Sequence, residues 1–142
     1  MKTKDFSGVK IALFCGGELV MVQRDDKPGL RFAGLWDFPG GAREGRETPL
    51  QTAVREVEEE LSLKLKPESI VWQETYPAMH DDKQIAYFMV AELTRGEVEA
   101  IKLGDEGQEW RLMDVEEFFD RNDVVGPLKG RLTGYLKAGN TR

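Results

Sequence analysis

The sequence lacks several features that define whole classes of protein. It has one cysteine, Cys15, so no disulfide can form within the chain, and one histidine, His80. No apolar run is long enough to cross a membrane, and the first residues lack the apolar stretch of a signal peptide. We therefore expect a soluble cytoplasmic protein. Cys15 ends the apolar run VKIALFC, so we expect a buried thiol, because a nucleophilic thiol needs an exposed electropositive setting.

Basic residues are outnumbered in this chain. There are 20 lysines and arginines against 26 aspartates and glutamates, which gives a net charge of −6. Such a chain cannot offer the broad basic surface that binds duplex nucleic acid or anionic membranes. A small anionic substrate is still compatible with this charge if a cation or a local basic cluster screens it.

The composition suits one ordinary domain. The 142 residues are 40% hydrophobic and 32% charged, and no repeat or linker interrupts them, so we predict a single domain over residues 1–142. Strands and helices mix without regular alternation, which favours an α+β fold with a mixed sheet flanked by helices. Gly16 and Gly17 are expected to join the first two strands as a hairpin. The predicted strands are Val9–Cys15, Glu18–Gln23, Leu35–Phe38, Ser69–Met79, Gln84–Leu93 and Gln108–Met113, and the predicted helices are Thr48–Leu61, one starting at Asp114, and Val125–Lys137.

The helix predicted over Thr48–Leu61 has the clearest pattern. Thr48 is expected to be its N-cap, Pro49 suits its first position, and Gln51 completes a capping box. One face of this helix is apolar and is expected to face the core; it consists of Leu50, Ala53, Val54, Val57 and Leu61.

An adjacent face of the same helix carries Glu56, Glu59 and Glu60, spaced i, i+3 and i+4. Like charges at these spacings oppose helix formation by about 0.2–0.5 kcal/mol per pair, and Arg55 relieves part of this through an i,i+4 pair with Glu59. A divalent cation would turn the repulsion into binding, and carboxylates without His or Cys are the donors that Mg²⁺ or Mn²⁺ prefers. On this pattern alone, a solvated acidic helix face is the simpler interpretation.

The longer segment Gly40–Leu63 changes that interpretation. It reads GGAREGRETPLQTAVREVEEELSL and resembles the signature of the Nudix hydrolases, which is Gly, five residues, Glu, seven residues, then Arg-Glu-apolar-x-Glu-Glu-x-Gly-apolar. Ser62 stands where the signature has its second glycine, which puts the left-handed end of the helix in question. The positions that match are Gly41, Glu47, Arg55, Glu56, Val57, Glu59, Glu60 and Leu63.

The resemblance implies an α/β/α sandwich that hydrolyses a diphosphate linkage with the help of Mg²⁺, or of Mn²⁺. It implies Glu59 and Glu60 as the principal metal ligands, with the backbone carbonyl of Gly40 as an addition. Glu56 is implied either as a further ligand or as the general base.

The remaining matched positions are implied to support the site. Gly41 belongs to the matched turn, Glu47 is expected near the metals, and Arg55 is expected to hold the carboxylates by hydrogen bonds. Glu106, late in the chain, matches a glutamate that can join the metal ligands, and Glu106 or Glu109 is the rival to Glu56 as the base. A solvated loop acid is the alternative for Glu106.

Shorter stretches resemble the MutT branch of the family, which hydrolyses nucleoside triphosphates to the monophosphate and pyrophosphate. These are WDFPGG at Trp36–Gly41, EGQEW at Glu106–Trp110 and a segment near the C-terminus, FFDRNDVVGPLKGRL. By the same resemblance Arg24 and Asn122 are expected to bind substrate. A plain surface arginine and an ordinary helix-cap or turn residue are the respective alternatives.

Several aromatic residues are candidates for a pocket that binds the base. Phe38, which we assign to substrate binding, and Tyr76, Phe88 and Trp110 could each stack on a base, although aromatic residues in strands more often belong to the core. The leading substrate is a nucleoside triphosphate, with oxidised or otherwise non-standard nucleotides as one option. Nucleotide sugars, dinucleoside polyphosphates and ADP-ribose are the alternatives, as is a catalytically silent domain that binds nucleotides. The oligomeric state is left open.

Overall fold

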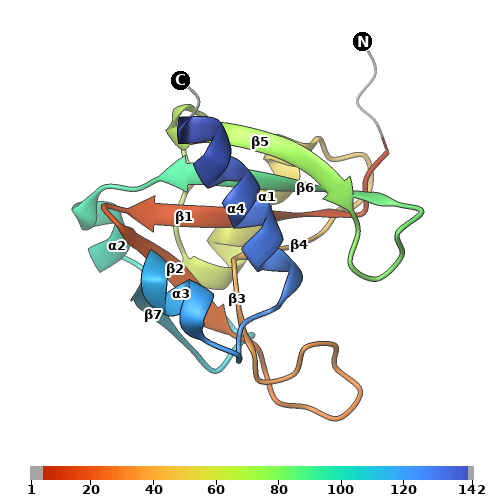
Figure 1. Ribbon diagram of the computed structural model, residues 1–142, viewed down its shortest axis with the longest axis horizontal. Coiled ribbons are helices and arrows are strands. Elements are labelled where there is room, and N and C mark those ends of the chain that lie inside the picture. The colour runs from red at the N-terminus through yellow and green to blue at the C-terminus, as the bar shows by residue number, and fades with distance from the viewer. Residues whose placement is uncertain (1–4, 141–142) are drawn as a thin grey trace.

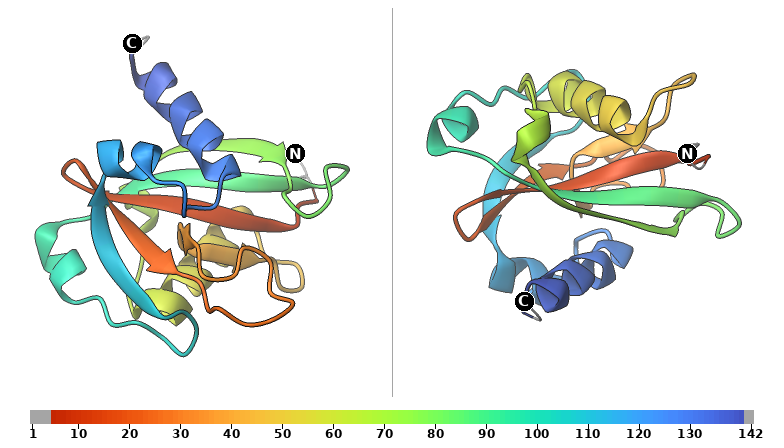
Figure 2. Two further views of the ribbon diagram at one scale, coloured as in Figure 1. Left: turned by 60° about the horizontal axis from the view of Figure 1, so that its bottom comes forward. Right: turned by 90° about the horizontal axis from the view of Figure 1, so that it is seen from above.

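The structure is a computed structural model that describes residues 5–140, in which one mixed sheet of seven strands lies between two layers of helices (Figure 1). In the right-hand view of Figure 2, α1 lies on one side of the sheet and α4 on the other. This arrangement confirms the predicted α+β sandwich. The strands are β1 (Gly8–Cys15), β2 (Glu18–Gln23), β3 (Trp36–Asp37), β4 (Gly40–Ala42), β5 (Ile70–Pro77), β6 (Ile85–Glu92) and β7 (Glu109–Asp114), and the helices are α1 (Pro49–Leu61), a 3₁₀ turn (Pro67–Ser69), α2 (Arg95–Glu99), α3 (Val115–Asp120) and α4 (Pro127–Asn140).

The central strand of the sheet is β1. It runs parallel to β6 and antiparallel to β2, and the predicted hairpin at Gly16 and Gly17 is present, with Cys15 paired to Glu18. Beyond these strands, β5 pairs with β6, while β3 and β7 pair with β2. No helix within residues 5–140 combines the length and apolarity that a membrane span needs.

The two strands of the hairpin separate after two residue pairs, and this separation makes room for the site. The far end of β1 pairs with β4, where Lys10 lies opposite Gly40, and the far end of β2 pairs with β3, where Val22 lies opposite Asp37. The chain between β3 and β4 therefore crosses from one strand to the other. It is fixed there by a hydrogen bond of 2.8 Å from the Ile11 amide to the Pro39 carbonyl.

Alternating side chains of the sheet build two apolar layers, as period-two strands require. On one face, residues such as Ile11 and Leu13 pack against the buried stripe of α1, and on the other face Phe88 and Val90 pack beneath α3 and α4. Leu50 departs from the prediction because it is 36% exposed at the first turn of α1.

Three elements were not predicted, namely β4, α2 and the 3₁₀ turn Pro67–Ser69. The strand β4 is rich in glycine, which disfavours strands locally, and it exists because it pairs with β1. Helix α2 is capped by Thr94, whose hydroxyl accepts from the Glu97 amide, but five residues are too few to show helical periodicity. Cys15 also differs from the prediction, since it is half-buried rather than buried.

The ends of α1 hold the acidic face in place. At its start Thr48 and Gln51 form the predicted capping box. At its end Ser62 adopts the left-handed conformation itself, with φ 57° and ψ 33°, and its amide donates to the Glu58 carbonyl at 2.9 Å. The amide of Gly104 donates to the Glu60 carbonyl at 2.8 Å, so the loop that carries Glu106 is attached to the C-terminus of α1.

The conformation of Ser62 leads to a prediction for the Ser62→Gly variant. A left-handed conformation costs a residue with a side chain about 1–2 kcal/mol, and glycine avoids this cost. Glycine also increases the conformational entropy of the unfolded chain, which offsets part of the stabilisation. We expect Ser62→Gly to raise the free energy of unfolding by about 0.5–1 kcal/mol in chemical denaturation. Ser69→Gly is the control and should lower it, because Ser69 does not have a positive φ. A loss of stability in Ser62→Gly would contradict this account.

Candidate active site

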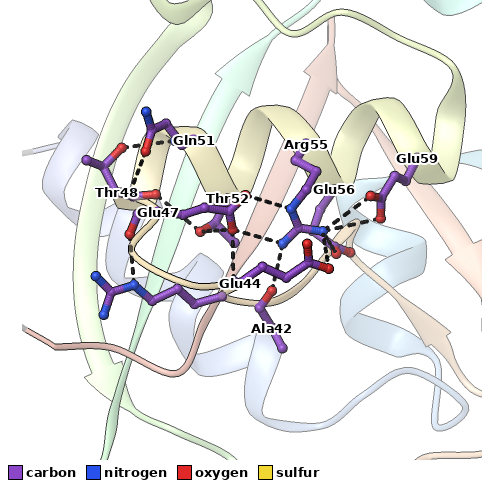
Figure 3. A network of polar contacts seen from close by, with 10 residues as sticks. Ala42, Glu44, Glu47, Thr48, Gln51, Thr52, Arg55, Glu56 and Glu59 are labelled. Atoms are coloured by element: carbon purple, nitrogen blue, oxygen red, sulfur yellow. Dashed lines mark hydrogen bonds and ion pairs between the residues drawn. The ribbon is translucent and has the colours of Figure 1, made fainter.

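Arg55 is the centre of a polar network on the exposed side of α1 (Figure 3). Its guanidinium donates to Glu47 at 2.7 and 3.0 Å, to Glu56 at 2.6 Å and to Glu59 at 3.2 Å, and it also donates to the Ala42 carbonyl at 2.8 Å. The expected i,i+4 pair with Glu59 is therefore present. Arg55 thus binds three of the four matched acids of the motif.

Glu47 is the best-stabilised carboxylate of this network. Besides the two bonds from Arg55, it accepts from the Thr52 hydroxyl at 3.0 Å and from the Glu44 amide at 2.9 Å. Hydrogen bonds to the charged form favour that form, so the Arg55 guanidinium lowers the pKa of Glu47 to about 2. Glu47 thus fixes Arg55 and the turn before α1.

Glu56 lies against the backbone of β4. A side chain on Gly41 would collide with the Glu56 carboxylate, which explains why this position is glycine. Burial raises the pKa of Glu56, and the hydrogen bond from Arg55 opposes that rise without cancelling it. Glu56 is therefore a carboxylate held close to the chain, with a proton affinity above that of an exposed glutamate.

Glu60 is the most buried acid of the motif. Its Oε2 accepts from the Gly40 amide at 3.0 Å, and burial raises its pKa to about 8 although nearby Lys10 lowers it. Gly40 makes this contact through its amide, whereas the sequence had suggested its carbonyl as a ligand. Gly40 has a φ of 143°, and a side chain there would collide with the Val9 carbonyl, so only glycine fits beneath Glu60.

Asp37 was missed by the sequence analysis and lies in the same place. Its Oδ2 accepts from Lys10 at 2.7 Å and from Arg24 at 3.1 Å, and its side chain is 5% exposed. The other oxygen, Oδ1, is buried without a hydrogen-bond partner among the described residues. The available signal was a charged residue inside the otherwise apolar strand LWDF, because a buried charge needs a partner or a ligand.

A cleft of about 240 Å³, here called the carboxylate cleft, opens beside Asp37 and Glu60, while Glu56 and Glu59 are not among its lining residues. Its lining includes Asp37, Glu60 and two residues that the sequence assigned to the site, Arg24 and Glu106. Arg24 also donates to the Arg31 carbonyl at 3.0 Å, so it is positioned rather than free. Glu106 is exposed on the loop after α2.

The aromatic and amide residues expected to bind a base lie elsewhere or are covered. Phe38 is 1% exposed, with its ring stacked near Phe88 and Phe118, so although it borders the carboxylate cleft its faces belong to the core. Phe88 is fully buried as well. Asn122 is exposed in the turn after α3, where no polar contact is formed with the described residues.

The possible metal-binding atoms of this site are of the type that a hard divalent cation prefers. All of them are oxygens, and Asp37 supplies one that is buried and lacks a partner. In the described part of the chain, however, no three His, Cys, Asp or Glu side chains already surround one point. Arg55 engages Glu56 and Glu59 instead. These two carboxylates would therefore have to turn away from Arg55 to bind an ion together with Glu60.

The buried position of Glu60 predicts how stability depends on pH. Because the folded protein keeps a proton on Glu60 up to a pKa of about 8 while the unfolded chain releases it near 4.5, folding is favoured at low pH. The free energy of unfolding, measured without divalent metal, should fall by up to about 1.4 kcal/mol per pH unit between pH 5 and 8 from this group.

Glu60→Gln, which mimics the neutral carboxyl, should remove this fall, whereas Glu58→Gln, an exposed neighbour on α1, should keep it. Chemical denaturation at each pH measures the effect. If the wild-type protein and Glu60→Gln show parallel pH profiles, Glu60 does not titrate as described.

Several solved structures share this fold. One is a MutT protein from Methanosarcina mazei Go1, with a TM-score of 0.75, 19% identity and 98% of each chain covered. Another is an Ap4A hydrolase from C. elegans, with a TM-score of 0.67, 20% identity, and 92% of this chain and 98% of that chain covered. A third is a bifunctional NMN adenylyltransferase/ADP ribose pyrophosphatase from Francisella tularensis, solved with AMP and a Mn ion, with a TM-score of 0.61, 21% identity, and 80% of this chain but 35% of that chain covered.

At these identities the likeness concerns the fold. The family is shown by the sequence itself, because the family model described as the NUDIX domain matches residues 6–131. That range includes the whole of α1, the glycines Gly40 and Gly41 and the loop that carries Glu106. The chain therefore belongs to the Nudix hydrolase family.

Proposed function

We propose that this protein hydrolyses nucleoside triphosphates to the nucleoside monophosphate and pyrophosphate, using Mg²⁺ or Mn²⁺ held by Glu59, Glu60 and Glu106, with Glu56 as the general base. The observation that carries the proposal is the buried Glu60 carboxylate against the Gly40 amide, beside a cleft that Arg24 and Lys10 supply with positive charge. A carboxylate that is shielded from water and has no cation paired with it can serve as an oxygen ligand of a divalent ion. Nudix hydrolases generally use divalent metal ions, which supports the same assignment.

The reaction needs one water and one base. Hydrolysis forms a bond between the water oxygen and a phosphorus atom, breaks the bond from that phosphorus to the bridging oxygen, and passes the water proton to a base. A bound divalent ion would screen the phosphate oxygens and lower the pKa of a bound water.

Glu56 is the residue best placed to receive the proton. It is half-buried against Gly41, and burial raises its pKa toward the range in which a general base works well. Arg55 fixes its carboxylate from the other side at 2.6 Å. Glu106 and Glu109 are the rival bases, and both are exposed. Glu106 also lies in the carboxylate cleft, so it remains in the proposed set of metal ligands.

Substrates in which the anhydride joins other groups are the second candidate. Two structures that share the fold are named as an Ap4A hydrolase and as an ADP ribose pyrophosphatase. Dinucleoside polyphosphates and ADP-ribose are therefore the alternative substrates. The chemistry at the carboxylates would be the same for all of them, because each contains a phosphoanhydride bond.

A substrate panel with Mg²⁺ tests the proposed reaction. The panel contains the nucleoside triphosphates, an oxidised guanine triphosphate, ADP-ribose, a nucleotide sugar and a dinucleoside polyphosphate, and chromatography resolves the products. We expect the highest kcat/KM for a triphosphate, with pyrophosphate and monophosphate as products and with activity lost in excess chelator. Higher kcat/KM for the other compounds would favour the second candidate. Activity that persists in chelator would refute the role of the metal.

Glu59 and Glu58 provide a matched pair of variants for the metal site. Both are exposed and adjacent on α1, but only Glu59 belongs to the acidic face next to Arg55. We expect Glu59→Gln to lower kcat/KM by on the order of 100-fold and to weaken Mg²⁺ binding in calorimetry, because a ligand contributes at least as much as its supporting groups. Glu58→Gln should leave both unchanged. Undiminished turnover in Glu59→Gln would show that the site is assigned wrongly.

A further inference from the structure

The loop between α2 and β7, residues 100–108, is attached to two separate parts of the site. Near its middle the Gly104 amide donates to the Glu60 carbonyl at 2.8 Å, which ties the loop to the C-terminus of α1. At its end the Gln108 amide donates to the Gln23 carbonyl at 2.9 Å, which ties it to the end of β2. The loop therefore connects the helix that carries the acids with the strand that leads to Arg24.

Two glycines allow the loop to lie this close to both elements. A side chain on Gly104 would collide with the Glu59 carbonyl. Gly107 has a φ of 91°, which residues with a side chain rarely adopt, and a Cβ there would come within 3.0 Å of the Val22 side chain. The backbone on each side of Glu106 is thus pressed against its neighbours.

Glu106 depends on this loop for its position. It is exposed and lines the carboxylate cleft, and its carboxylate forms no hydrogen bond or ion pair within residues 5–140. Glu47 and Glu56 differ in this respect, because Arg55 holds the carboxylates of both. The place of the Glu106 carboxylate is therefore decided by whatever fixes the loop.

The side chain of Gln108 supplies a further attachment at the cleft. Its Nε2 donates to the Arg24 carbonyl at 2.9 Å. The Arg24 amide donates to the Leu35 carbonyl at 2.8 Å and its guanidinium donates to Asp37, so the residue that receives the Gln108 bond is itself held firmly. Gln108 thus ties the loop of Glu106 to a fixed point on the same cleft.

We infer that Gln108 is a positioning residue for Glu106, and that its side-chain bond to the Arg24 backbone holds the Glu106 carboxylate at the cleft ready to bind a divalent ion. A ligand that is ordered before the ion arrives binds it more tightly, because less conformational freedom is lost on binding. Gln108 itself contacts neither the ion nor the substrate. The inference rests on the proposed function only in taking Glu106 as a metal ligand.

A double-mutant cycle measured as Mn²⁺ binding tests the inference without any nucleotide. Calorimetry compares the wild-type protein with Gln108→Met, Glu106→Gln and the variant that combines them. We expect Gln108→Met to weaken Mn²⁺ binding about fivefold, the effect of one hydrogen bond. In the combined variant the binding should be no weaker than in Glu106→Gln, because Gln108 acts through Glu106. A merely structural role would weaken binding by the same factor in both backgrounds.

Gln73→Met, on the exposed side of β5, is the matched control and should bind Mn²⁺ as the wild-type protein does. Since Gln108 is also exposed, Gln108→Met should keep a wild-type midpoint in chemical denaturation. Wild-type Mn²⁺ affinity in Gln108→Met or in Glu106→Gln would overturn the inference, as would equal losses in the two backgrounds. None of these outcomes depends on which compound the substrate panel identifies, so the inference and the proposed reaction can fail separately.

Discussion

The close approach between the Gly40–Gly41 backbone and the carboxylates of α1 is the contact on which the rest of the site depends. Glu60 accepts a hydrogen bond from the Gly40 amide, and Glu56 lies against Gly41, so neither position can carry a side chain. The approach is possible because β1 and β2 separate early and leave a gap that the chain from Asp37 to Gly40 crosses. The topology of the sheet thus decides which backbone segment the carboxylates of α1 contact.

The acids of the motif fall into two groups with opposite proton affinities. Arg55 keeps the pKa of Glu47 low, while burial raises the pKa of Glu56 and Glu60. Glu47, the outer acid, therefore stays ionised and anchors Arg55 at any physiological pH. Glu56 and Glu60, the inner acids, are carboxylates whose negative charge is costly without a partner. Ligands that must lose a proton bind a metal with release of that proton. An ion at the inner acids would replace a proton rather than only adding charge.

The features that could be predicted from the sequence are those that depend on neighbouring residues. The capping box at Thr48, the glycine hairpin and the Arg55–Glu59 pair all depend on residues a few positions apart, and all are present. The strand β4 was missed because it exists through pairing with β1, 30 residues earlier in the case of Lys10 and Gly40. Asp37 was missed for a similar reason, since its two cations come from β1 and from the residue after β2.

The carboxylates of the motif belong to only one of the two helical layers of the fold. Glu56, Glu59 and Glu60 belong to α1, whereas α3 and α4 pack on the opposite face of the sheet. Residues on α4 can therefore change without altering the contacts of Glu56 or Glu60 with the glycines. This separation gives a physical reason why a shared fold and motif identify the reaction more closely than the substrate.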